Sequence, residues 1–272
     1  MKRIFLILIV ISMCITLTAC KKTLEIKNEN NIGTASFLYD LKEEYIGNNP
    51  VLGNILNKLG LDNYGKYKYE IKDNYLTISY YEVEGWGNIL NNKELVIEKS
   101  ALILTLIDDC NEVGWYANNK QEIITLKELN DKYGDIKGYG KSLEAFNNLL
   151  IKLNYYENSD PIQFKINELT STGMKLNIIN STDKSYLYGD DFTIKKKDGN
   201  KWKDIEGTPE FFNAIGYTLL PNNNVEIDIN WNVKLKNGIY KITKDFDEII
   251  DESDLEMKFG KRYYISVEFS IE

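Results

Sequence analysis

The hydrophobic pattern of the sequence changes its period near residue 160, and this change constrains the fold more than any other feature. Before that point, apolar residues recur at helical spacing in several stretches, such as residues 142–153. After it, apolar and polar residues alternate, as in Val225–Trp231 and Tyr263–Ile271. Because the polar stretch Asn154–Pro161 separates the two patterns, we expect a domain boundary there.

The first half mixes helical and strand signals, which predicts an α+β domain over residues 37–154. In Asn49-Pro50, the asparagine is a predicted helix cap and the proline suits the first helical position. Alternating residues on both sides of Asp73-Asn74 predict a β-hairpin. Thr125-Leu126-Lys127-Glu128 has the form of a capping box and marks the start of another helix.

The second half, residues 161–272, contains a series of short alternating segments, which predicts an antiparallel β-sandwich. Asp198-Gly199 is a typical hairpin turn within it. Each fully buried aliphatic or aromatic side chain contributes roughly 1.5–3 kcal/mol, so we expect this core to form without a disulfide. The cysteine and tryptophan spacing of antibody domains is missing, which excludes that class.

The first residues of the chain have the pattern of an export signal. Lys2 and Arg3 precede an aliphatic run, Ile4–Leu17, that contains no charged residue. Because a membrane-spanning helix needs about 20 apolar residues, this run is too short to be a permanent anchor. We therefore expect the segment to direct export.

The residues at the end of the aliphatic run indicate which type of export signal this is. Leu17, Thr18, Ala19 and Cys20 resemble the bacterial lipobox, in which the cysteine receives a diacylglycerol and the peptide is cleaved just before it. The resemblance implies a lipoprotein signal peptide over residues 1–19 and lipid attachment at Cys20. The alternative is an ordinary secretory signal that happens to contain a cysteine.

A lipidated cysteine would place the mature chain outside the cytoplasm, anchored to the cell membrane through its fatty acyl chains. The stretch that follows is polar and shows no apolar period. We therefore expect residues 20–36 to be a flexible tether that holds the folded part away from the membrane.

Charge and composition exclude several classes of function. The net charge is −8, and loss of Lys2 and Arg3 with the signal leaves 31 basic against 41 acidic residues, or −10. Such a chain repels nucleic acid. Histidine is absent, which removes the usual base of serine and cysteine hydrolases and the commonest zinc ligand. Of the three cysteines, Cys14 would leave with the signal and Cys20 would carry lipid, so Cys110 has no partner for an intramolecular disulfide. We predict that the Cys110 thiol is buried and inert. We also predict that the chain binds no cofactor.

Two stretches are candidate binding sites. Residues 247–256 are strongly acidic, and Asp247, Asp251 and Asp254 are candidate calcium ligands. The alternative is a solvated acidic loop between two strands. Trp86 lies between two glycines and is a candidate for stacking on a sugar or gripping a peptide. The alternative is that its ring folds back over its own core.

Several motifs of the first half occur together in a known family: Tyr45–Pro50, Val51–Ile55, Leu76–Tyr81 and Gly114–Tyr116. With them, this half resembles an uncharacterised bacterial domain family that also occurs beside or within the extracytoplasmic parts of BlaR-type sensor metalloproteases. That family brings no established catalytic residues. The paired histidines of the peptidase helix are missing from this sequence.

The second half carries its own set of motifs: Tyr188–Phe192, Lys197–Trp202, Ala214–Pro221 and Asn237–Ile242. They resemble a bacterial immunoglobulin-like (Ig-like) domain family that is common in surface lipoproteins of Gram-positive bacteria. The usual proline before the glycine of the last motif is Asn237 here. The resemblance implies an extracytoplasmic Ig-like fold and no particular reaction.

Together these observations predict a membrane-anchored, non-enzymatic binding or interaction module at the cell envelope. Its partners would be the membrane, through the lipid anchor, and an envelope protein or glycan. One alternative is a sensory accessory domain that detects an envelope ligand or stress for a membrane partner. Another is an enzyme that works with carboxylates.

Overall fold

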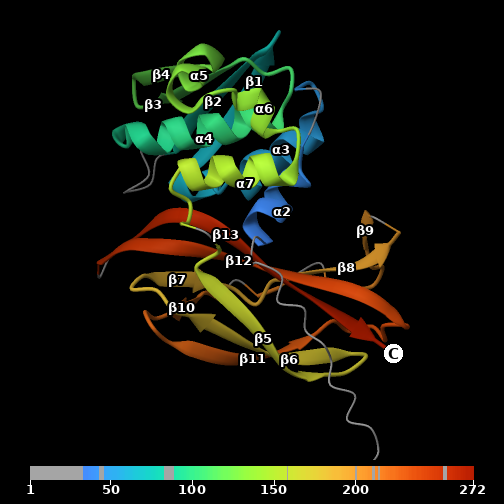
Figure 1. Cartoon of the computed structure of the whole chain (residues 1–272). Coiled ribbons are helices and arrows are strands. Elements are labelled where there is room, and N and C mark those ends of the chain that lie inside the picture. The colour runs from blue at the N-terminus through green and yellow to red at the C-terminus, as the bar shows by residue number, and fades with distance from the viewer. Residues whose placement is uncertain are drawn as a thin grey trace, which may run out of the picture.

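The computed structural model describes residues 33–42, 46–82, 89–157, 159–199, 201–209, 212–213, 215–253 and 256–272. An α+β part comes first and a β-sandwich follows, as the sequence predicts (Figure 1). Within these ranges, no helix is long and apolar enough to cross a membrane.

The α+β part is built around a four-stranded sheet in the order β1-β2-β3-β4. Its strands are β1 (Lys66–Lys72), β2 (Tyr75–Glu82), β3 (Glu112–Ala117) and β4 (Lys120–Thr125). The pairing of β1 with β2 confirms the predicted hairpin, and its turn residue Asp73 has φ 52°. β2 and β3 are parallel, so the chain must cross over between them.

Helices pack against this sheet, and several of them lie between it and the sandwich (Figure 1). They are α2 (Gly33–Tyr39), α3 (Asn49–Lys58), α4 (Lys93–Leu106), α5 (Leu126–Tyr133), α6 (Ile136–Tyr139) and α7 (Leu143–Lys152), with short 3-10 turns η1 (Leu61–Tyr64) and η2 (Ile89–Asn91). α4 makes the crossover from β2 to β3 and is buried along most of its length. The Trp115 indole on β3 donates to Ser100 Oγ of α4 at 2.8 Å, which fixes the helix on the sheet.

The end of α4 is held by a lysine on α6, a helix that the sequence pattern did not predict. The Lys137 ammonium donates to the carbonyl oxygens of Leu104, Ile107 and Cys110 at 2.6, 2.7 and 2.6 Å. A cation at this position complements the helix dipole. The Cys110 thiol is buried, as predicted, and burial raises its pKa to about 11.

The structure corrects two boundaries predicted from local signals, the end of the tether and the start of one helix. α2 begins at Gly33, so residues 33–36, predicted to be part of the tether, are helical. The Thr34 hydroxyl accepts from Tyr264 N at 2.8 Å, a contact 230 residues away that no local pattern reveals. α3 includes Asn49, and its capping position is Asn48, which makes no side-chain capping bond. The capping box at Thr125 and Glu128 is confirmed.

The second part is a sandwich of two sheets. Its strands are β5 (Ile162–Leu169), β6 (Gly173–Asn180), β7 (Ser185–Tyr188), β8 (Thr193–Asp198), β9 (Lys201–Asp204), β10 (Tyr217–Leu219), β11 (Asn224–Asn230), β12 (Gly238–Ser253) and β13 (Glu256–Ile271). One sheet has the order β11-β6-β5. The other has the order β10-β7-β12-β8-β9, with β13 on the opposite side of β12. Trp231, fully buried, stacks on Phe269 between them.

The long hairpin β12–β13 joins the two parts of the molecule. Figure 1 shows it between the helices and the rest of the sandwich. Each of its strands has 16 residues, and the pairing continues as far as Ser253 and Glu256. The acidic stretch from Asp247 to Ser253 is therefore strand, and the predicted acidic loop is wrong for these residues. Pairing with β13 supplies the partners that the sequence pattern could not show.

Candidate functional site

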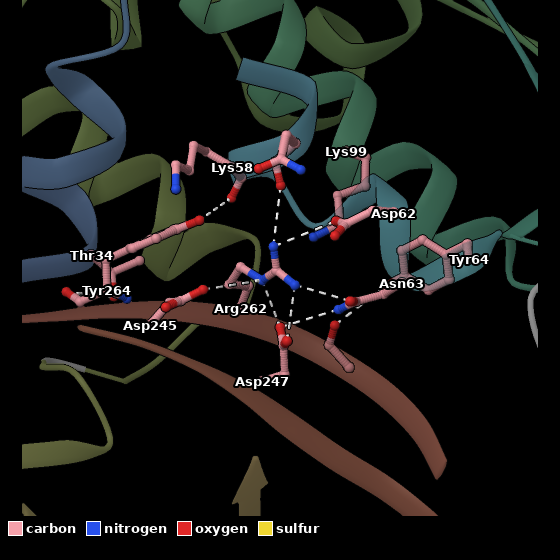
Figure 2. Close-up of polar contacts among 12 residues, drawn as sticks. Thr34, Lys58, Asp62, Asn63, Tyr64, Lys99, Asp245, Asp247, Arg262 and Tyr264 are labelled. Carbon is pink, nitrogen blue, oxygen red and sulfur yellow. Dashed lines mark hydrogen bonds and ion pairs between the residues drawn. The ribbon is translucent and has the colours of Figure 1, made fainter. Parts of the chain in front are cut away.

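One face of the β12–β13 hairpin meets the α+β part, and we call this contact the interdomain seam. Asp245 and Asp247 lie two residues apart on β12, so their side chains share a face. The register places them opposite Tyr264 and Arg262 of β13. Figure 2 shows these four side chains directed at the end of α3 and at η1.

Arg262 is the centre of the seam. Its guanidinium donates to both oxygens of Asp247, from Nε at 2.8 Å and from Nη2 at 2.9 Å. Nη2 also donates to Asn63 Oδ1 at 2.9 Å, and Nη1 to Asn57 O at 3.2 Å. Burial opposes the charge of Arg262, but the hydrogen bonds with Asp247 raise its pKa further above its usual range. A bidentate pair of this kind fixes the relative position of its two strands and of η1.

The seam also closes the carboxyl end of α3. Arg262 contacts Asn57 O, and the Tyr264 hydroxyl donates to Lys58 O at 2.7 Å. These carbonyl groups lack partners within the helix. The Tyr264 ring stacks on Phe37 of α2, with 3.9 Å between centroids. One strand of the sandwich thus donates hydrogen bonds to the end of α3 and stacks an aromatic ring on α2.

A second group of contacts lies further along β13. The Tyr263 hydroxyl donates to Tyr155 O at 2.8 Å, and the Tyr64 hydroxyl donates to Gly260 O at 3.2 Å. The Lys261 ammonium donates to Asn154 O just after α7. Five consecutive residues of β13, from Gly260 to Tyr264, therefore contact η1, the end of α3 or the linker and hold the two parts together.

Buried charges gather near these contacts. Lys99 of α4 is 1% exposed and lies 3.4 Å from its neighbour Glu98. Burial lowers the pKa of Lys99, while the charge of Glu98 raises it. Lys261 of β13 lies 3.8 Å from Glu98, so the sandwich supplies a second cation to this carboxylate. Separation of the two parts would remove that cation from a buried negative charge.

Asp160, in the linker between α7 and β5, is a further buried charge. Its Oδ2 accepts from Thr34 N at 3.1 Å, whereas Oδ1 has no hydrogen-bond partner. Burial raises the pKa of this carboxyl group to about 7, although hydrogen bonds from Thr34 and Gly33 act in the opposite direction. The linker is thereby fixed to the start of α2 by a group that titrates near neutral pH.

Beside the seam, the surface of the sandwich contains a cavity of about 280 Å³. Its lining residues include three acidic ones, Asp191, Asp245 and Asp247, and two aliphatic ones, Leu187 and Ile215. The lining residues come from β7, from β12 and from the segments around them, including the one before β10. This combination of a few polar groups with an apolar wall is typical of ligand sites.

Two of these carboxyl groups form a pair. The side chains of Asp191 and Asp245 are hydrogen-bonded to each other. Burial and then the charge of Asp191 raise the pKa of Asp245 to about 6, while Arg262 and Lys58 lower it. Glycosidases hold their two carboxyl groups about 5–9.5 Å apart, whereas a hydrogen bond brings two oxygens to about 3 Å. The pair does not have the spacing of a glycosidase.

The predicted site residues fall in different places. Both oxygens of Asp247 accept hydrogen bonds, from Arg262 and Asn63, so this calcium candidate is engaged in the seam. Asp251 pairs with Lys258 across the hairpin, and its side chain is outside the described residues. Asp254, Trp86 and the segment Leu17–Cys20 also lie outside them. Among the described residues, no three His, Cys, Asp or Glu side chains are grouped to hold a metal ion.

Sequence reasoning missed the residues that build the seam and the cavity. One signal was available: Arg262 and Arg3 are the two arginines of a chain rich in lysine. Arginine at a single position after residue 3 indicates a need for a planar, bidentate donor. No such signal marks Asp160, Asp191 or Asp245, because their importance comes from burial and from partners distant in sequence.

Comparison with known proteins bears on the second part of the chain. Residues 157–265 match the family model of a bacterial Ig-like domain. Comparison with curated proteins found no match. The matched residues include β5 to β12 and the first ten residues of β13, which are the two sheets of the sandwich. The second part of this chain is therefore a bacterial Ig-like domain.

Proposed function

We propose that this chain is a membrane-anchored surface lipoprotein that acts as a non-enzymatic binding module at the cell envelope. The main observation in favour of binding is the cavity beside the seam, which both acidic and aliphatic residues line. The lipobox-like residues Leu17–Cys20 support the anchor and the location outside the cytoplasm. The partner would be an envelope protein or a glycan.

The neighbourhood of the cavity also supports a binding role. Ile215, Tyr217 and Leu220 are 52%, 39% and 53% exposed. They occur within six consecutive positions and make up three of the seven exposed large hydrophobic side chains among the described residues. Exposed apolar side chains that gather in this way mark interaction surfaces. Resemblance of the first part to an uncharacterised extracytoplasmic family agrees with the same role.

The anchor is tested by metabolic labelling with an alkyne analogue of palmitate in the native bacterium. We expect the wild-type protein to incorporate the label and the Cys20→Ala variant to lose it, because the thiol is the site of acylation. Cys110→Ala is the matched control, since this buried thiol cannot be reached, and it should keep full labelling. Equal labelling of wild type and Cys20→Ala would contradict the anchor.

The binding role needs a separate test. Envelope extracts are passed over the immobilised mature chain, and over a variant with Ile215→Ser and Leu220→Ser, two exposed positions. We expect a retained envelope component that the variant loses. Turnover of a defined substrate, with nothing retained from the envelope, would instead favour a carboxylate-based enzyme.

A sensory role is the second candidate, and one observation favours it. Asp160 and Asp245, which hold the linker and the seam, have pKa values raised to about 7 and about 6 by burial. Acidification of the envelope would then change the charge of the contact between the two parts. If the gene is deleted and the response of the cell to external acid is unchanged, this role is contradicted.

A further inference from the structure

The four-stranded sheet of the α+β part has two unlike faces. Ile78 and Trp115 are paired across β2 and β3 and lie fully buried on the face that packs against α4. Alternate residues of a strand point to the other face, where Ile123 is 41% exposed and the side chains of β1 are exposed as well. Figure 1 shows α4 and α7 between the sheet and the sandwich, so this second face, which we call the outer face, is directed away from the sandwich.

Two tyrosine rings lie along the middle of the outer face. A Cβ atom at Gly114 would be 1.9 Å from Tyr75 Oη and 3.1 Å from Tyr116 Cε2, so both side chains occupy the space above this glycine. Tyr75 is opposite Glu112 in the register, and its side chain must cross the sheet diagonally to reach Gly114. The two hydroxyl groups are hydrogen-bonded to each other at 3.3 Å. The outer face therefore has an aromatic surface in its middle, built on a residue without a side chain.

The charges around these rings balance one another. Lys68 lies 3.4 Å from Glu70 on β1, and Lys72 and Glu112 are the neighbours of Tyr75 on the strands to either side. These two lysines and two glutamates leave no net charge beside the rings, in a chain whose net charge is −8. Aromatic platforms for single-stranded nucleic acid lie in positively charged grooves. The outer face lacks that charge among its described residues, and its balance favours an uncharged ligand.

The other groups of the outer face indicate the class of that ligand. A pyranose ring has C–H groups on its flat sides and hydroxyl groups around its rim. Its C–H groups bury apolar surface against an aromatic ring, and the hydroxyl groups of Thr77 and Ser79 and the amide of Gln121 offer donors and acceptors beside the rings. A protein partner needs a larger apolar centre, whereas Ile123 is the one aliphatic residue among those that the register places next to Gly114 and the two rings on this face.

We propose that the outer face binds an uncharged glycan, with pyranose rings stacked on Tyr75 and Tyr116. The four strands span about 14 Å, which accommodates a short extended oligosaccharide. A sheet face of this kind fits a straight, β-1,4-linked chain better than a curved, α-1,4-linked one. The inference goes beyond the cavity of the sandwich and the lipid anchor and needs neither of them. The variant with Ile215→Ser and Leu220→Ser and the labelling of Cys20 test those two features separately.

The test is an NMR titration of the unacylated mature chain, residues 20–272. The probes are two uncharged β-1,4-linked hexasaccharides, chitohexaose and cellohexaose, the curved maltohexaose and the acidic hexagalacturonate. We expect shifts of the backbone amides of Thr77, Gly114 and Ile123 with the first two, and affinity weaker by roughly tenfold or more for the curved and the acidic probe. Tighter binding of chitohexaose would assign an N-acetylated glycan as the source, and tighter binding of cellohexaose a plain glucan.

Substitutions on the outer face locate the sugar rings. Tyr75→Leu should weaken binding of the β-1,4-linked probes by roughly tenfold or more, because it removes a stacking surface, whereas Tyr75→Phe keeps the ring and should stay within about threefold of wild type. Ile123→Ser should weaken binding by about threefold or more. Ile239→Ser is its matched control, since Ile239 is 44% exposed on β12 of the sandwich, and it should leave affinity unchanged. Thermal unfolding of each variant verifies that it is folded.

Three results would overturn the proposal. The first is wild-type affinity in the folded Tyr75→Leu chain, or affinity for hexagalacturonate equal to that for the uncharged probes. The second is a set of shifts centred on Leu187 and Gly216 in place of Gly114, which would put the glycan in the cavity of the sandwich. The third is a dimer, seen by light scattering, that Ile123→Ser dissociates, because the outer face would then be occupied by a second copy of the chain.

Discussion

Replacement of Arg262 by methionine is expected to lower the free energy of unfolding by about 3–5 kcal/mol. The substitution leaves Asp247, 14% exposed in the seam, without its bidentate donor, and it removes the hydrogen bonds that Arg262 donates to Asn57 O and Asn63 Oδ1. Loss of one partner from a buried ion pair has a larger effect than loss of the whole pair, since the remaining charge stays away from water. The measurement is urea denaturation of the unacylated mature chain, followed by circular dichroism.

The same experiment shows whether the seam couples the two parts. Because Arg262 connects β13 with α3 and η1, we expect the single calorimetric transition of the wild type to separate into two in the variant. Lys127→Met is the control, since it removes an exposed ion pair with Asp131 on α5 and should change stability by less than about 0.5 kcal/mol. In the double variant Arg262→Met with Asp247→Leu, much of the lost stability should return.

An effect of Arg262→Met no larger than that of Lys127→Met would contradict the role given to the seam. If stability falls strongly but a single transition remains, Arg262 stabilises the chain but does not make the two parts unfold together. If Asp247→Leu does not restore the stability lost in Arg262→Met, the unpaired charge of Asp247 is not the cause of that loss.

The second large effect is a fall in stability as the pH rises from about 4 to about 7, with Asp160 as its main source. The pKa of an aspartate carboxyl group is ordinarily 3.8, and burial raises that of Asp160 to about 7 in the folded chain. Between these values the folded state binds a proton that the unfolded state has lost. Stability from this group is therefore complete below about pH 4 and is lost by about pH 7, which amounts to roughly 4 kcal/mol.

Asp160→Asn isolates this contribution. The asparagine keeps an oxygen to accept from Thr34 N but does not ionise. We expect its unfolding free energy to depend much less on pH between about 4 and 7 than that of the wild type, as measured by urea denaturation at a series of pH values. Asp204→Asn, at an exposed position of β9, should keep the wild-type dependence. Equal pH dependence in wild type and Asp160→Asn would show that Asp160 does not ionise within this range.

Local patterns predicted the elements of this fold well, because most of their signals lie within a few residues. The capping box at Thr125, the hairpin turn at Asp73 and the alternation of Val225–Trp231 each reflect a backbone requirement of the segment itself. The start of α2 could not be predicted in this way. It depends on Thr34 contacts with Tyr264 and Asp160, residues from the other end of the chain and from the linker.

The candidate site was still less accessible to sequence reasoning. The acidic stretch that begins at Asp247 attracted a calcium hypothesis because its charges are adjacent in sequence. In the structure, the carboxylate of Asp247 is matched by Arg262, which is 15 residues away on the paired strand. The carboxyl pair of the cavity joins Asp191 and Asp245, which are 54 positions apart. Pairing of strands creates both contacts, and single-sequence patterns do not specify which strands pair.

The central claim is that this chain works outside the cytoplasm on a lipid anchor. Mass spectrometry of the protein purified from native membranes tests it most directly. A mature N-terminal peptide that begins at Cys20 and carries the mass of a diacylglyceryl group is the predicted result. An unmodified peptide that begins at Met1, recovered from the cytosolic fraction, would contradict the claim.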